Sequence, residues 1–205
     1  NIILGKGLHI NIVDLIKKAT EPFVNKGIVK GDLFELYDEI IDFFKQRLRN
    51  VLLDRDYDYD VIDSVLKVGL TDIQDSFLRI EELAKWKKRE DFLDIVSSFI
   101  RVSNLAKKAE SSQVNTELLS EAEEKLLYDS YINVSHVFNE AMVKKEYDNA
   151  LKAIMTMKPY IDDFFDNIMV MVEEENIRIN RLAILKSIEN MMLAFADLSI
   201  IVVSK

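Results

Sequence analysis

The chain has 205 residues, a formal net charge of −9, no cysteine, and only five glycines and two prolines. The lack of cysteine excludes disulfides, thiolate metal sites and cysteine nucleophiles, and the scarcity of helix-breaking residues favours long helices over a turn-rich β protein. No apolar run reaches the roughly 20 residues that a transmembrane helix needs, so we expect a cytoplasmic protein with no membrane partner.

Helical periodicity runs along almost the whole chain. Apolar residues recur at steps of three and four, which predicts helices at residues 33–53, 60–69, 71–86, 90–109, 117–145 and 147–157, one that begins near Pro159, and a last one over 176–202. Asp60 is expected to cap the second of these helices, and Thr71 with Gln74 to form a capping box at the start of the third. No strand is predicted.

The predicted fold is therefore all-α, a helical bundle. Because the first residue is not methionine, we expect the chain to be part of a longer one. Residues 1–31 are expected to be a short helical remnant of the preceding region, and residues 32–205 to form one helical domain.

The charges are unevenly distributed along this acidic chain. Residues 32–63 carry ten acidic against four basic residues, whereas residues 85–108 carry seven basic against three acidic ones. A uniformly acidic surface would repel phosphate, because electrostatic attraction dominates non-specific nucleic-acid binding. The basic charge is thus concentrated in one stretch, and the remainder is a solvating acidic surface. No DNA partner is expected.

The sequence lacks the patterns that are typical of catalysis and of metal binding. His9 and His136 lie far apart and have no HExxH pattern, and Gly5 with Gly7 lacks the remainder of either phosphate-binding glycine motif. The acidic run at 173–175 does not suit a metal ion, because consecutive helical residues point about 100° apart. We expect no catalytic residue, no metal ligand and no cofactor in this chain.

The predicted helix over 90–109 separates into two faces. Its buried stripe is expected to comprise Phe92, Ile95, Val96, Phe99, Val102 and Ala106. On the other side, Ser97, Arg101, Asn104 and Lys108 form a polar row that suits phosphates and base edges. An ordinary solvated face accounts for the same pattern equally well.

The single tryptophan lies in a basic cluster. Trp86 is flanked by Lys85, Lys87, Lys88 and Arg89, an arrangement that suits stacking of single-stranded bases. The alternative, which is the commoner role of a lone tryptophan at a helix end, is that Trp86 covers the core.

Two arginines of the last predicted helix require an explanation. Arg181 falls within the apolar stripe, and a buried arginine is costly unless it is paired. We expect a structural ion pair for Arg181, with one of the aspartates Asp162, Asp163 and Asp166. Arg178, one turn earlier and nearer the edge, is expected to face an anionic ligand.

Four segments, in this order along the chain, carry a resemblance to a known family: "QRLRNVLLDRDYDYDVIDSVL", "FIRVSNLAKK", "NTELLSEAEEKLLY" and "FFDNIMVMVEEENIRINRLAIL". The last one, at residues 164–185, resembles a "FFDxVMVM" segment followed by an "R-x-NRL" helix in the β subunit of bacterial two-subunit glycine–tRNA ligase. The resemblance covers roughly residues 45–200.

The resemblance implies the helical, DALR-type anticodon-binding domain at the C-terminal end of that subunit. It implies a fragment that binds glycine tRNA and is not catalytic by itself, within an enzyme that is an aminoacyl-tRNA synthetase. The α subunit, in an α₂β₂ tetramer, would use ATP and Mg²⁺ to activate glycine. The segment at 164–185 would then be a hairpin of two bundle helices.

Ten residues, chosen by charge, helix face and motif position, are candidates for contacts with tRNA: Arg47, Arg49, Trp86, Lys88, Arg101, Asn104, Lys107, Lys108, Arg178 and Arg181. The rival hypothesis is a helical protein–protein interaction module that docks on a partner subunit without reading RNA. An exposed apolar patch rather than a cationic one would favour the rival.

Overall fold

The computed structural model describes residues 2–29 and 32–202, and within these ranges it is all-α, as predicted. The helices are α1 (Ile2–Lys6), α2 (Ile12–Asn25), α3 (Leu33–Leu53), α4 (Tyr59–Lys67), α5 (Ile73–Lys87), α6 (Phe92–Ala106), α7 (Ala122–Val143), α8 (Tyr147–Met155), α9 (Lys158–Asn167) and α10 (Glu175–Leu193). Two short 3₁₀ turns, η1 (Thr116–Leu118) and η2 (Leu198–Ile200), complete them. No helix in the described ranges is both long and apolar enough to span a membrane.

The chain divides into two compact units, Asn1–Ala84 and Lys85–Lys205. This division differs from the boundary expected after residue 31. Compactness does not say which residues belong to an RNA-binding domain, so the expected division into 1–31 and 32–205 stays a prediction.

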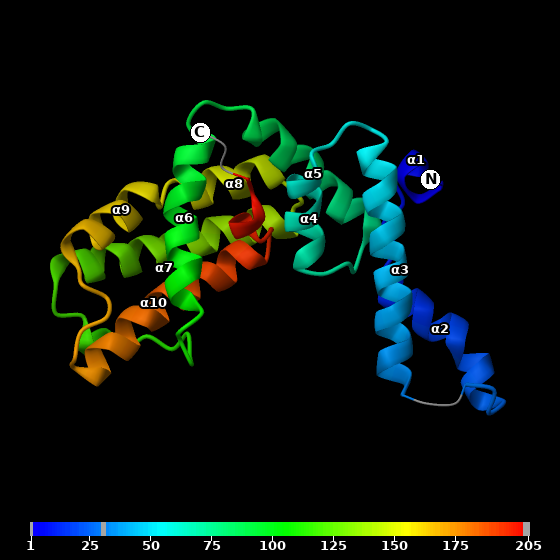
Figure 1. Ribbon diagram of the computed structural model, residues 1–205, viewed down its shortest axis with the longest axis horizontal. Coiled ribbons are helices and arrows are strands. Elements are labelled where there is room, and N and C mark those ends of the chain that lie inside the picture. Colours follow the sequence, from blue (N-terminus) through cyan, green and yellow to red (C-terminus); the bar gives the residue numbers. More distant parts are fainter. Residues whose placement is uncertain (1, 30–31, 203–205) are drawn as a thin grey trace. The chain divides into compact units, whose positions relative to one another are not determined.

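In the first unit, the long helix α3 packs against α2 and α4 (Figure 1). The helix begins where predicted, because the Asp32 side chain accepts a hydrogen bond from the backbone N–H of Phe34 at 2.7 Å. An ion pair joins it to α4: Arg49 donates to both carboxylate oxygens of Asp63, at 2.6 and 3.0 Å.

Two helices of this unit begin differently from the prediction. Asp58, in an extended conformation, is the N-cap residue of α4, whereas Asp60 is already helical and is buried. At the start of α5, Asp72 accepts from the N–H of Asp75, and the Thr71 carbonyl instead accepts from the N–H of Ile12. In both places an aspartate other than the predicted residue occupies the cap position, and both Asp and Thr can serve there.

The second unit is a bundle in which α10 packs across α6 and α7, α7 contacts α8 and α9, and α6 contacts α9 (Figure 1). The predicted stripe of α6 is confirmed, since all six of its residues are buried. Five phenylalanines of this unit are fully buried: Phe92, Phe99, Phe138, Phe164 and Phe195. Apolar burial of this extent is the main force that stabilises such a bundle.

The last helix is shorter than the predicted range 176–202. It ends at Leu193, and the chain then turns through the buried Phe195 and Ala196 into η2. The Asp197 side chain accepts from the N–H of Ser199 at 3.1 Å and so supports the new turn. The apolar residues after Leu193 continue the helical pattern, but the chain leaves the helix there. Phe195, Ala196, Leu198 and Ile201 are buried, and η2 packs against α6.

Candidate nucleic-acid interface

The face of α6 opposite its buried stripe carries exposed polar side chains. Arg101 and Asn104 lie one turn apart, and Lys107 and Lys108 follow at the C-terminal end of the helix. We call these four residues the α6 basic face. Ser97, which the sequence places in the same row, is half-buried and donates to the Leu93 carbonyl at 2.8 Å, so its hydroxyl serves the helix itself.

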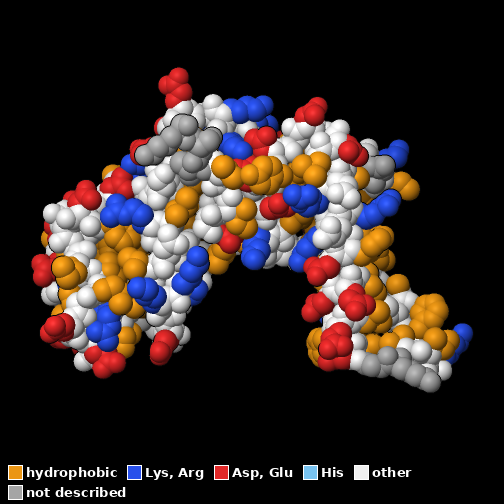
Figure 2. Space-filling model, in the orientation of Figure 1, with side chains coloured by type: hydrophobic (Ala, Val, Ile, Leu, Met, Phe, Trp, Pro, Cys, Tyr) orange, Lys and Arg blue, Asp and Glu red, His pale blue; other side chains and the backbone are white. Residues whose placement is uncertain are grey.

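The α6 basic face carries three cations, Arg101, Lys107 and Lys108. Among residues 2–29 and 32–202, no carboxylate lies within ion-pair distance of Arg101, Lys107 or Lys108. Figure 2 shows blue side chains over the lower end of α6, whereas red ones gather over the ends of α9 and α10. Two lysines at a helix C-terminus interact favourably with the helix dipole. Because no described carboxylate pairs with these cations, the surface over them is locally positive although the chain has a net charge of −9.

Arg101 is held by an aromatic ring of the neighbouring helix. Its guanidinium carbon lies 4.4 Å from the ring centroid of Phe165 on α9. Phe165 is half-buried and meets the fully buried Phe164 edge to face, with centroids 5.6 Å apart. The sequence reasoning missed Phe165 as a residue of this site, since the "FF" pair reads as core; only contact between α6 and α9 reveals it.

A charge network joins α6 to α9 beside this contact. Asp162 accepts from the hydroxyl of Ser98 and from the ammonium of Lys158, each at 2.5 Å, and Lys158 also pairs with Asp94 at 3.1 Å. Burial would raise the pKa of Asp162, but the hydrogen bonds from Lys158 and Ser98 and the charges of Lys158 and Arg101 outweigh it and lower that pKa. Hydrogen bonds to Asp162 and Asp94 raise the pKa of Lys158.

Trp86 is not available to stack on a base. Its side chain is buried, with 4% of the residue exposed, and its indole N–H donates to Asp148 at 3.0 Å. The guanidinium of Arg89 covers the ring at 4.1 Å and is itself bound by both oxygens of Asp91. The alternative interpretation, a tryptophan that covers the core, fits this geometry. Lys88 beside it is exposed.

Arg181 has a structural environment, as expected, but with a different partner. It is 7% exposed, its Nε donates to the buried carboxylate of Glu124 on α7, and its Nη1 donates to the Met169 carbonyl at 2.8 Å. The predicted partners Asp162, Asp163 and Asp166 are therefore wrong. They lie on α9, whereas α10 packs its buried face against α6 and α7.

Glu124 completes this junction by capping α7. Its second carboxylate oxygen accepts from the backbone N–H groups of Ser120 and Glu121, at 2.9 and 3.2 Å. The usual sequence signal of a capping box, Ser or Thr followed three residues later by Glu, would point to Ser120 and Glu123, whereas the structure forms the box with Glu121 and Glu124.

Arg178 also binds backbone in this structure. Its Nη1 donates to the carbonyls of Val172 and Glu173, at 2.8 and 3.2 Å, in the loop between α9 and α10. Residues 164–185 run from α9 through a loop into α10, but the predicted hairpin is wrong, because α10 packs on α6 and α7 and not on α9. Arg178 and Arg181 hold the loop between the two helices. Asn180 follows Arg178 on α10 and forms two hydrogen bonds with the backbone of Asn115. Its side-chain oxygen accepts from the Asn115 N–H at 2.7 Å, and its amide nitrogen donates to the Asn115 carbonyl at 3.0 Å.

The candidates of the first unit have separate surroundings. Arg49 is paired with Asp63 as described above. Arg47 is exposed and lines an apolar groove of about 600 Å³ between α1 and α3, beside Phe43 and Leu8. Exposed apolar surface of this kind is what the rival hypothesis of a docking module requires.

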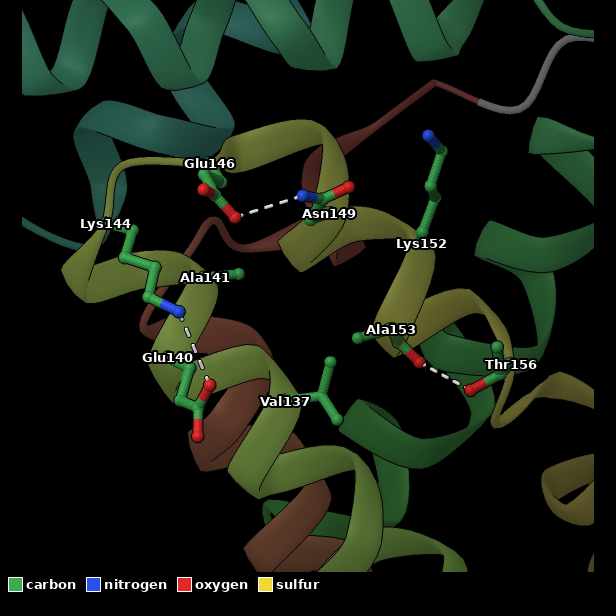
Figure 3. A pocket seen from close by; sticks show the side chains of 9 residues that line it. All are labelled: Val137, Glu140, Ala141, Lys144, Glu146, Asn149, Lys152, Ala153 and Thr156. Carbon is green, nitrogen blue, oxygen red and sulfur yellow. Dashed lines mark hydrogen bonds and ion pairs between the residues drawn. The ribbon is translucent and has the colours of Figure 1, made fainter.

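A second cavity, of about 340 Å³, lies between α7 and α8 (Figure 3). The polar side chains that line it are largely occupied by one another: Lys144 pairs with Glu140 at 3.5 Å, and Asn149 donates to Glu146 at 3.1 Å. None of the ten predicted contact residues lines it.

Comparison with known proteins bears on what the α6 basic face binds. Residues 95–201 match the DALR anticodon binding domain family, a range that includes the whole α6 basic face. The chain is 36% identical over 197 residues to a glycine–tRNA ligase β subunit of Geotalea daltonii, covering 96% of this chain and 28% of the relative. It is 35% identical over 202 residues to a glycine–tRNA ligase β subunit of Clostridioides difficile, and this match covers 98% of this chain and 29% of the relative. The chain thus spans less than a third of these relatives.

Proposed function

Because the chain belongs to the DALR anticodon-binding domain family, we propose that it is the tRNA-binding, anticodon-recognising part of a glycine–tRNA ligase β subunit. The similarity to β subunits at about 35% identity, over nearly the whole chain, is the observation that carries this proposal. The fragment itself would recognise tRNA and perform no chemistry.

The catalytic part of the proposed enzyme would lie in another subunit. Activation of glycine would take place on the α subunit with ATP and Mg²⁺, within an α₂β₂ tetramer in the cytoplasm. Glycine tRNA would be the ligand of the present chain. RNA loops are recognised by shape, cationic contacts to the backbone and stacking of unpaired bases, and the α6 basic face offers such groups.

The α6 basic face is the proposed tRNA contact. Arg101, Lys107 and Lys108 are exposed and have no carboxylate partner among the described residues, and Asn104 adds an exposed amide on the same side. Lys88 and Arg47, which are also exposed, stay as secondary candidates. The other four predicted residues are occupied by partners inside the protein: Arg49, Trp86, Arg178 and Arg181.

The first test is a salt titration of binding between the assembled ligase and glycine tRNA, with a tRNA altered in its anticodon for comparison. We expect affinity to fall as salt rises, because bound cations release counterions from phosphate. Lys107→Ala and Lys108→Ala should each lower the slope of the logarithm of the binding constant against the logarithm of the salt concentration by about one, if each lysine contacts a phosphate. Arg101→Ala should weaken binding and reduce discrimination against the altered anticodon.

Lys144→Ala is the matched control, because Lys144 is an exposed lysine of the same unit that is paired with Glu140. We expect it to change neither the affinity nor the slope. Equal effects of all the lysine variants would mean that the α6 basic face is not the contact, and binding that ignores the anticodon would contradict anticodon recognition.

A docking module that does not read RNA is the less favoured alternative. The apolar groove that suits it belongs to the first unit, whereas the family match begins at residue 95. The groove is compatible with assembly of a larger enzyme.

A further inference from the structure

The stack of Arg101 on Phe165 differs from the other arginine–aromatic contacts of the described residues. Arg89 lies as close to Trp86, but both oxygens of Asp91 occupy its donors. The guanidinium of Arg55 lies farther from its ring, 5.8 Å from the centroid of Phe77. Within the described chain, Arg101 alone combines a close ring with donors that no carboxylate occupies.

The ring that holds Arg101 is itself fixed. Phe165 packs edge to face on the fully buried Phe164. Next to it, Lys158 and Asp162 of α9 bind Asp94 and Ser98 of α6, so the two helices are joined by several polar contacts where the arginine crosses between them. An arginine side chain that is free in solution samples many rotamers, whereas the guanidinium of this one lies over a ring, 4.4 Å from its centroid, before any ligand arrives.

We propose that Phe165 is a positioning residue for Arg101, and that the exposed side of the Arg101 guanidinium is a stacking platform for one unpaired RNA base. Arginine planes stack on bases as aromatic rings do. The Phe165 ring lies against the guanidinium, and no described carboxylate occupies the N–H groups of Arg101, which leaves them for a phosphate or a base acceptor. Asn104, one turn further along α6, and Lys108, just after the end of the helix, would continue the contact along the RNA strand. The platform rests on the proposed function, since it assigns a role within the same RNA site.

The neighbouring carboxylate favours this geometry. Asp162 is close enough for the Arg101 charge to affect its ionisation, yet the two form no ion pair. The oxygens of Asp162 are instead bound by Ser98 and Lys158. The guanidinium is thus attracted toward α9 and the ring without losing its donors to a salt bridge.

A double-mutant cycle in the assembled ligase tests the positioning role. Phe165→Leu should weaken binding of glycine tRNA about two- to fivefold, by removing the ring that orients the cation, and Arg101→Ala by at least about fivefold. Because Phe165 acts through Arg101, the double variant should bind no more weakly than Arg101→Ala alone. Phe165→Tyr, which keeps the ring, should bind as the parent does. Independent, multiplicative losses would overturn the proposal.

Single abasic substitutions along the anticodon loop test the stacked base. At one unpaired position, loss of the base should weaken binding to the parent protein by at least about fivefold and should have no effect on the Arg101→Ala variant. If every position affects both proteins equally, the platform is wrong while tRNA binding stands. If the parent ligase does not bind the tRNA, the proposed function is wrong and the platform with it.

Discussion

At the scale of single residues, the partners of each arginine decide its role. Arg181 is buried against Glu124 and a carbonyl, Arg178 fastens a loop, and Arg101 lies exposed on a ring. All three have the same charge, and two of them lie within one motif. Arginine is suited to each role because its planar group offers five donors and two stacking faces.

Arg181→Ala should destabilise the second unit strongly. It leaves the carboxylate of Glu124, which is 1% exposed, without its cation, and breaking a buried pair from one side costs about 3–5 kcal/mol in the free energy of unfolding. Urea unfolding followed by Trp86 fluorescence measures this unit, since Trp86 is the only tryptophan. Arg178→Ala, which removes only half-buried backbone contacts, should cost about 1–2 kcal/mol. Equal losses for the two variants would contradict a buried ion pair.

At the scale of elements, polar bridges hold the bundle helices in place. The bridge between α6 and α9 consists of Ser98, Asp162, Lys158 and Asp94. The sequence predicted both helices, and it indicated the exposed row of α6. It did not indicate that α9 lies beside that row, because helical periodicity identifies the buried face of a helix and not the helix that covers it.

Asp162→Asn should remove part of the stability of this unit in a pH-dependent way. The folded-state pKa of Asp162 is lowered, so its ionised form adds stability that is fully present above the unfolded pKa of about 3.8 and is lost as the pH falls through the folded value. The difference in unfolding free energy between parent and variant should be constant near neutral pH and shrink toward pH 2.

Asp166→Asn is the control for this variant. Asp166 is exposed on the same helix and has no hydrogen bond or ion pair within the described part of the chain. Unfolding free energies at a series of pH values should show no comparable loss for it. A difference between parent and Asp162→Asn that grows toward low pH would contradict the assigned direction.

At the scale of the whole molecule, the second compact unit and the family match begin at different residues. The second compact unit begins at Lys85, ten residues before the match at residue 95. Those ten residues include Trp86, which donates to Asp148, and the fully buried Phe92. They therefore belong to the core of the second unit although the family match excludes them.

A chain of residues 85–205 should fold by itself, whereas residues 95–205 should be much less stable. The shorter chain lacks two buried aromatic side chains, and truncation of each such side chain costs about 3–5 kcal/mol. Circular dichroism during urea unfolding gives the unfolding midpoints of both chains. Tryptophan fluorescence would not serve for the shorter chain, because that chain lacks Trp86. Equal midpoints would mean that Trp86 and Phe92 contribute little to the unit.

The sequence alone determined most of the helices, though not the end of the last one, and it determined the buried stripe of α6, its exposed cations and the resemblance to the family. These follow from periodicity and motif order, which are local properties of the chain. Only the tertiary structure decided which candidates are exposed: it buried Trp86, paired Arg181 with Glu124, and laid Arg101 on Phe165. The physical reason is that these partners lie 57 to 64 residues apart along the chain, as for Glu124 and Arg181 or Ser98 and Asp162, and only the packing of helices brings such groups together.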